Sequence, residues 1–305
     1  MSRVWIDIAY LVAAILFILG LKGLTRPKTA VRGNLFGAIG MLVAIVVTLF
    51  DHNVVSFGTI IVGVIIGAAI GGVLAIRIRM EAMPEMVALL NGLGGAASFL
   101  VAGAEIYRKY HDAMALAGGE GAGNDKIIEA LHSLTPAGAG VAVAASGLIG
   151  AVTLLGSLVA FAKLAEYKFL RQIPKIPQQQ IVNLVLGGLC LLLCVIVANN
   201  PGAQGMYWLL VLLGLVLGYS LTISIGGADM PVVIALLNSY SGLAAAATGF
   251  VLQNNVLIIA GSLVGASGVI LTKIMCDAMN RSLPAVLFGT LGPTADGPTA
   301  DEVYT

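Results

Sequence analysis

The chain has 305 residues, of which 59% are apolar and only 10% are charged, and its mean hydropathy is +1.00. Soluble domains carry roughly 25% charged residues, so this composition excludes a soluble globular protein. A membrane-crossing helix needs about 20 apolar residues, and the apolar content suffices for roughly nine such helices. A net charge of +1 without a basic stretch also excludes a nucleic-acid-binding protein.

The apolar runs predict an all-α integral membrane protein with nine transmembrane helices, because lipid offers no partners for unpaired backbone groups. The first run follows one basic residue, Arg3, and has no small-residue cleavage site, so we expect a retained helix and not a signal peptide. The expected spans are 5–24, 34–50, 54–76, 83–104, 136–163, 181–199, 206–223, 230–251 and 256–275.

The distribution of Lys and Arg predicts the orientation, because basic connections stay in the cytoplasm. With the N-terminus outside, twelve of the sixteen basic residues fall in cytoplasmic connections and four in external ones. Nine spans then place the C-terminus in the cytoplasm.

Two segments are expected to lie outside the membrane. Residues 105–134 are Gly-rich around Gly118–Gly123 and are expected to form a flexible external loop. Near the end, Gly292–Asp296 is repeated as Gly297–Asp301, and such a Pro/Gly/Thr-rich sequence cannot bury a core. We therefore expect a transmembrane domain over 1–282 and a linker over 283–305.

An internal repeat is the most informative feature of the sequence. Met83–Asn91 recurs as Met230–Asn238, each copy with Pro in the position that suits a first helical turn. The spacing of Gly156 and Ser157 before Lys163 resembles, more weakly, that of Ala266 and Ser267 before Lys273. Two parallel copies predict two similar helical hairpins related by an axis along the membrane normal.

Polar side chains within the spans are the candidate functional groups, because ionisable residues there are nearly absent. Asn91 and Asn238 occupy identical places in the two copies, about two turns into their helices, on faces that also carry Ser98 and Ser241. Two interpretations stay open: these amides line a polar route, or they only bond neighbouring helices for about 1 kcal/mol each. Further hydroxyls that extend such a lining are Ser146, Thr153, Ser157, Ser262, Ser267 and Thr272.

An amide does not titrate near neutral pH, so a proton relay needs a histidine or carboxylate. The candidates within the chain are Glu85 and Asp229, each at a cytoplasmic helix start, where a negative charge is also favourable by itself. Asp229 closes the pliable Gly226–Asp229 connection, which contains no basic residue. We expect its carboxylate to be unpaired and to sense a docked domain.

Other patterns indicate structure. Gly63, Gly67 and Gly71 predict a close-packing ridge on the third span. Gly92–Ala97 spells a dinucleotide-binding loop but follows no strand, so we reject it.

Four motifs together resemble the beta subunit of proton-translocating NAD(P) transhydrogenase, and the resemblance runs from the first helix to the linker. The motifs are Met83–Leu90, Gly226–Val233, Leu237–Gly242 and Met275–Ser282. The resemblance implies a nine-helix membrane domain followed by a cytoplasmic NADP(H)-binding domain. It also implies an alpha polypeptide that binds NAD(H) and adds membrane helices, a dimer of the complete unit, and a bacterial cytoplasmic membrane location.

The resemblance implies roles for individual residues. Asn238 matches an asparagine lining the proton path, Asp229 an acid facing the NADP domain, and Ser267 a residue of a pore-side Gly/Ser segment. Many members carry the histidine central to proton passage where this chain has Asn91, so here that histidine is expected on an alpha-type partner helix. The chain resembles a truncated beta subunit without the NADP-binding domain, and we expect no hydride transfer by it alone.

The sequence thus favours a proton channel that couples inward proton flow to hydride transfer from NADH to NADP⁺, binding no cofactor or metal itself. A secondary transporter of a small solute is an alternative, since parallel repeats and amides in the membrane suit one. A passive membrane anchor for soluble domains is another.

Overall fold

The computed structural model describes residues 3–50, 57–119, 123–136, 138–167, 178–200 and 202–287. Within these ranges nine helices are long and apolar enough to cross a membrane and no strand is present, which confirms the expected all-α class. The long helices are α1 Arg3–Leu24, α2 Pro27–Leu49, α3 Phe57–Arg77, α4 Met83–Ala117, α6 Ala139–Leu164, α8 Gln179–Asn199, α9 Gln204–Ile223, α10 Met230–Leu252 and α11 Asn255–Ala278. The short elements are η1 Met80–Ala82, α5 Asn124–Leu134, η2 Gly227–Asp229 and α12 Leu283–Leu287.

Helices α2 and α4 extend furthest beyond their expected bounds, because their added ends are polar. Helix α2 begins at Pro27, where proline fits the first turn, and its first two turns carry Lys28 and Arg32. Of the expected linker 283–305, the first residues form α12, whose Val286 is buried, and 288–305 lie outside the described residues.

The expectation of a flexible loop over 105–134 is wrong for the part of it that the structure describes. Helix α4 continues to Ala117, and Gly118 ends it with a left-handed φ of 110°. Helix α5 then folds back and buries Ile127 and Leu131 against Ala113 of α4. The two residues are four apart on one helix face, so the segment is an amphipathic helix rather than a solvated loop.

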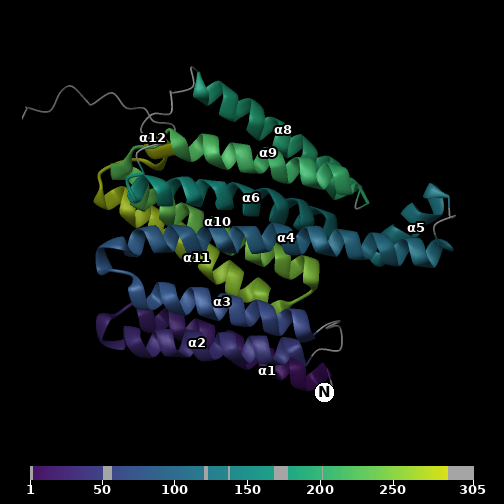
Figure 1. Cartoon of the computed structure of the whole chain (residues 1–305), viewed down its shortest axis with the longest axis horizontal. Coiled ribbons are helices and arrows are strands. Elements are labelled where there is room, and N and C mark those ends of the chain that lie inside the picture. Colours follow the sequence, from purple (N-terminus) through teal and green to yellow (C-terminus); the bar gives the residue numbers. More distant parts are fainter. Residues whose placement is uncertain are drawn as a thin grey trace, which may run out of the picture.

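Helix α6 lies at the centre of the bundle and packs against α4, α8, α9 and α10 (Figure 1). The α1–α2 hairpin lies on one side, next to α11, and α8 and α9 lie on the other. Helices α10 and α11 form a hairpin, and α5 extends past the bundle at the end of α4.

Glycines set the closest helix contacts. A Cβ on Gly95 of α4 would lie 2.5 Å from the carbonyl oxygen of Gly150 on α6, and one on Gly150 would lie 2.6 Å from that of Gly95. Between α10 and α11, a Cβ on Gly242 would lie 2.5 Å from the backbone nitrogen of Gly265. Small residues allow backbones to approach this closely, which is how helices associate in lipid.

Helix α3 contrasts with this packing, since none of its residues is buried. A Cβ added at Gly63, Gly67 or Gly71 would meet no atom of the described chain within 4 Å. The predicted close-packing ridge is therefore present in sequence but packs against nothing within these residues.

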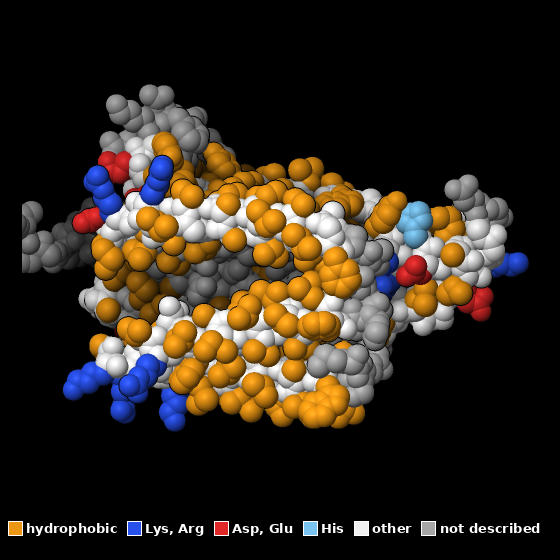
Figure 2. Space-filling model, turned by 60° about the horizontal axis from the view of Figure 1, so that its bottom comes forward, with side chains coloured by type: hydrophobic (Ala, Val, Ile, Leu, Met, Phe, Trp, Pro, Cys, Tyr) orange, Lys and Arg blue, Asp and Glu red, His pale blue; other side chains and the backbone are white. Residues whose placement is uncertain are grey.

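The described surface has apolar side chains along the helices and charged ones at their ends (Figure 2). Lys and Arg gather at the end where α1, α3, α6 and α11 finish and α4 and α10 begin; we call this the basic end and the opposite end the far end. This asymmetry is the one from which the sequence predicts a cytoplasmic basic end.

Candidate functional site

Asn91 lies inside the bundle, where α4 meets α10. Its side chain is 8% exposed, and its Nδ2 donates to the carbonyl oxygen of Ile234 on α10 at 3.4 Å. The hydroxyl of Ser241, two turns later on α10, donates to the backbone carbonyl of Asn91, also at 3.4 Å. The amide therefore bridges the two helices that carry the sequence repeat.

A row of hydroxyls continues from Asn91 toward the far end. Ser98 lies seven residues after Asn91, which places it on the same face of α4 about 10 Å along the axis. Ser146 of α6 is fully buried; its hydroxyl donates to the carbonyl of Ser98 at 3.1 Å and lies 2.7 Å from that of Thr248 on α10. We call Asn91, Ser98, Ser146, Ser241 and Thr248 the polar row. It joins α4, α6 and α10.

Ser157 of α6 adds a buried hydroxyl that has no hydrogen-bond partner among the described residues. The exposed fraction of Ser157 is 0%. A Cβ added at Gly92 would lie 3.2 Å from the Cβ of Ser157, so Ser157 lies beside the residue that follows Asn91. Buried hydroxyls nearly always have a partner, from protein or from ordered water. The hydroxyl of Ser157 is therefore an unusual buried polar group next to the polar row.

Asn238 lies on the face of α10 that contacts α4. It is half-buried, and its side chain makes no hydrogen bond within the described residues. It follows Ile234 by four residues and precedes Ser241 by three, so it shares the helix face that Asn91 contacts. The two amides face the same helix contact, but they do not bond to each other.

Other predicted residues lie outside the polar row. Ser267 and Ser262 are exposed on α11, and the hydroxyl of Ser267 donates to the carbonyl of Val264 on its own helix. Glu85 is half-buried in the first turn of α4 and makes no hydrogen bond or ion pair among the described residues.

The expectation that Asp229 is unpaired is wrong. Its side chain is 3% exposed, and Arg281 Nη1 donates to both carboxylate oxygens at 2.9 Å. Arg281 follows α11, 52 residues away in sequence, so inspection of the Gly226–Asp229 segment alone missed the partner. The ion pair joins the start of α10 to the end of α11 at the basic end.

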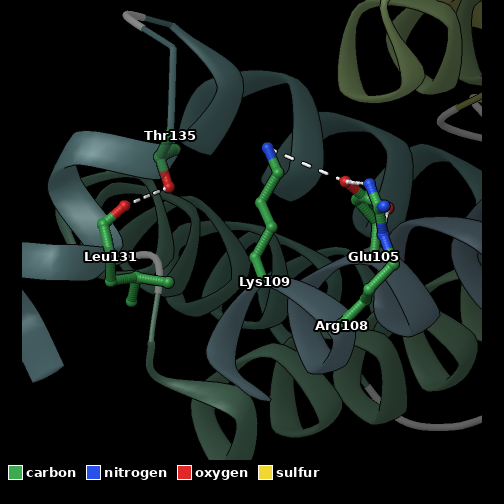
Figure 3. Close-up of polar contacts among 5 residues, drawn as sticks. All are labelled: Glu105, Arg108, Lys109, Leu131 and Thr135. Atoms are coloured by element: carbon green, nitrogen blue, oxygen red, sulfur yellow. Dashed lines mark hydrogen bonds and ion pairs between the residues drawn. The ribbon is translucent and has the colours of Figure 1, made fainter. Parts of the chain in front are cut away.

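Glu105 is a buried carboxylate that sequence reasoning missed. Arg108 donates to its two oxygens at 2.9 and 2.7 Å, and Lys109 Nζ lies 3.9 Å away (Figure 3). Glu105 and Lys109 line a pocket between α4, α5, α6 and α8 at the far end, together with Thr135. Asn91, Ser98 and Glu105 are spaced by seven residues, and this spacing alone would have placed Glu105 on the face of the polar row.

No dinucleotide fits the Gly92–Ala97 sequence, which was rejected above as a nucleotide loop. These residues lie inside α4, and Gly95 is in contact with the backbone of α6.

The chain matches the family model of the NAD(P) transhydrogenase beta subunit over residues 6–304. It is 43% identical over 284 residues to NAD(P) transhydrogenase subunit beta of Rhodospirillum rubrum, and a second sequence of that subunit, from a named strain of the species, matches equally. The alignment covers 93% of this chain and 58% of the relative, so the chain spans less than two thirds of the length of these relatives. A match over nearly the whole chain shows that this multi-pass membrane protein belongs to the NAD(P) transhydrogenase beta-subunit family.

Proposed function

We propose that this chain forms the proton-conducting membrane part of a transhydrogenase, which couples inward proton flow to hydride transfer from NADH to NADP⁺. The polar row is the observation that carries this proposal. Five polar residues on α4, α6 and α10 lie at the contacts of these three helices, and beside them is the hydroxyl of Ser157, which has no hydrogen-bond partner among the described residues. Polar groups are costly in hydrocarbon, and we propose that this row lines a path for protons.

The titrating group is proposed to come from another polypeptide. The amides of Asn91 and Asn238 donate and accept hydrogen bonds but do not titrate near neutral pH. Asn238 has no hydrogen-bond partner within the described residues and is half-buried, so part of its side chain is open to a neighbouring chain. A histidine on an alpha-type helix, oriented there, would exchange protons with one side of the membrane at a time.

The Asp229–Arg281 pair is proposed as the place where the soluble domain acts on the membrane part. It lies at the basic end and ties together the ends of two helices, one of which carries Asn238. NADP(H) would bind in the soluble domain that follows the membrane part and NAD(H) in the alpha subunit, so hydride would pass between those domains. We propose a dimer of the complete unit in a bacterial cytoplasmic membrane.

Asn238→Leu tests the path. In the assembled enzyme in membrane vesicles, we expect it to lower proton uptake and the linked hydride transfer at least about tenfold, because leucine cannot orient a proton-carrying group. Asn199→Leu is the matched control, since Asn199 is exposed and its amide bonds only within α8. Unchanged proton-linked turnover of the Asn238 variant would refute the path and favour a passive anchor.

A second test exchanges positions. Asn91→His, combined with removal of the partner's histidine, should restore part of the pumping, because position 91 faces the same α4–α10 contact as Asn238. Ala97→His is the control, since Ala97 is exposed on α4. Failure of Asn91→His to restore pumping, or equal rescue by Ala97→His, would contradict a shared role for position 91 and the partner histidine.

A further inference from the structure

Lys163, on the last turn of α6, reaches across to the connection between α9 and η2. Its Nζ donates to three backbone carbonyl oxygens: Thr222 at 3.1 Å, Ile223 at 2.6 Å and Ile225 at 2.6 Å. An ammonium group has three protons, so these bonds use all of them. Among the described residues Lys163 has no ion-pair partner. All three hydrogen bonds of Lys163 therefore go to this one stretch of backbone.

These bonds meet a need of the fold. Helix α9 ends at Ile223, and the last carbonyls of a helix have no partner within it. A positive charge at a helix C-terminus is also favourable, because the backbone dipoles point their negative end there. The carbonyls of Leu221 and Thr222 already accept from the Ser224 hydroxyl and the Ile225 N–H, and Lys163 adds, from another helix, a donor for the carbonyl of Ile223.

The connection beyond Ile225 is held by few other contacts. A Cβ on Gly226 or Gly227 would meet no atom of the described residues within 4 Å, so neither glycine is packed against them. After them comes Asp229, held by Arg281. One cation therefore fixes each end of this segment, Lys163 at its start and Arg281 at its finish.

Helix α6 also contacts the polar row. Gly156 lies against Thr222, since its Cβ would be 3.0 Å from the Thr222 hydroxyl oxygen, and the neighbouring Ser157 lies against Gly92. Ala160 belongs to the same buried cluster as Ile225 and Met230 at the basic end. One rigid helix thus joins the surroundings of Asn91 to the segment that leads to Asp229.

We propose that Lys163 is a positioning residue for proton-coupled turnover: it fixes the α9–α10 connection and thereby places Asp229 against Arg281. This proposal rests on the proposed function. It adds Lys163 to the Asp229–Arg281 pair as a third residue at the basic end that links the soluble domain to the membrane part. Lys163 acts on Asp229 through the backbone of residues 222–229 and touches no proton-carrying group itself.

Lys163→Met in the assembled enzyme in vesicles should lower proton-linked hydride transfer about tenfold, because three charged hydrogen bonds are lost. Lys163→Arg should keep most of the rate, since guanidinium also donates several hydrogen bonds. Lys273→Met is the control: Lys273 follows Ala266 and Ser267 at the spacing by which Lys163 follows Gly156 and Ser157, is exposed, and bonds to nothing among the described residues. Wild-type turnover of the Lys163→Met enzyme would overturn the proposal.

A double-mutant cycle separates positioning from general support. If Lys163 acts through Asp229, adding Lys163→Met to Asp229→Asn should lower the rate by less than about twofold, since coupled residues are not additive. If the fold-losses in rate of the two single variants multiply in the double variant, the two residues act independently and the proposal is overturned. If the cycle shows no coupling but Asn238→Leu still lowers turnover strongly, the proton path stands and only the role of Lys163 is refuted. Wild-type turnover of Asn238→Leu would refute the path itself.

If the Lys163→Met enzyme does not assemble, Lys163→Gln serves with a distance measurement. Spin labels at Ser224→Cys and Glu81→Cys, both exposed positions at the basic end, report the place of the connection relative to η1. We expect a broader distance distribution in the glutamine variant, because an amide has two donor protons and no charge. An unchanged distribution would contradict the proposal.

Discussion

Helices α3 and α10 cross the membrane in one chain, yet they differ in every aspect of packing. In the most apolar stretch of α10, 67% of the residues are buried, whereas in that of α3 none is. The more apolar helix is the less buried one. Hydropathy therefore does not identify the interior of this protein, whereas small and polar residues that contact another helix do.

The reason is the solvent. Lipid tails are as apolar as leucine, so an apolar helix gains little by leaving lipid, and helices associate through close packing and hydrogen bonds. Helix α10 has both, through Gly242 against α11 and the contacts of Ile234, Ser241 and Thr248 with α4 and α6. The glycine ridge of α3 has neither within the described chain, and its face is open to lipid or to another polypeptide.

Among substitutions in the closely packed helices, Arg281→Leu should lower the free energy of unfolding the most. It leaves the carboxylate of Asp229 buried without its cation, and breaking such a pair costs about 3 kcal/mol or more in the free energy of unfolding. Denaturant titration of the purified chain in detergent measures this change.

The double variant Asp229→Leu/Arg281→Leu should recover most of that loss, because no charge then stays buried. Lys273→Leu, which removes an exposed cation from the same helix end, should change stability by less than about 0.5 kcal/mol. If the single Arg281 variant were as stable as the Lys273 variant, the ion pair would not stabilise the basic end.

Gly95→Ala against Gly67→Ala tests the comparison with a single methyl group. On α4 the methyl meets the carbonyl of Gly150 at 2.5 Å, so α4 and α6 must separate, at a cost of about 2 kcal/mol. On α3 the methyl meets nothing within the described chain, and stability should not fall. Equal melting temperatures for the two variants in detergent would contradict the close α4–α6 contact.

Nine spans and the all-α class followed from the sequence because each run had to satisfy its backbone inside lipid. The hairpin that the end of α4 forms with α5 did not follow from the sequence, because these segments are polar. Only the packing of Ile127 and Leu131 against Ala113 reveals it. The site was predictable where polarity is rare, as at Asn91. The pairing of Asp229 with Arg281 and the reach of Lys163 to α9 depend on tertiary contacts between distant segments, which no local pattern encodes.

Ser146→Ala should have the smallest effect on the free energy of unfolding. It tests whether the polar row mainly holds α4, α6 and α10 together. The hydroxyl links α6 to Ser98 on α4 and Thr248 on α10, but Thr248 also reaches the carbonyl of Ala244 on its own helix. The variant therefore leaves no orphaned group on α10, and we expect a loss of about 0.6 kcal/mol in unfolding free energy, the average for hydrogen bonds between membrane helices. Ser262→Ala, on the exposed face of α11, is the control and should be neutral.

A loss above about 2 kcal/mol would mean that the row serves mainly to hold the helices together, because hydrogen bonds measured between membrane helices contribute less than that. A loss near the expected value together with reduced proton uptake would separate the two roles, since so small a change in stability leaves the bundle folded while the path loses one of its hydroxyls.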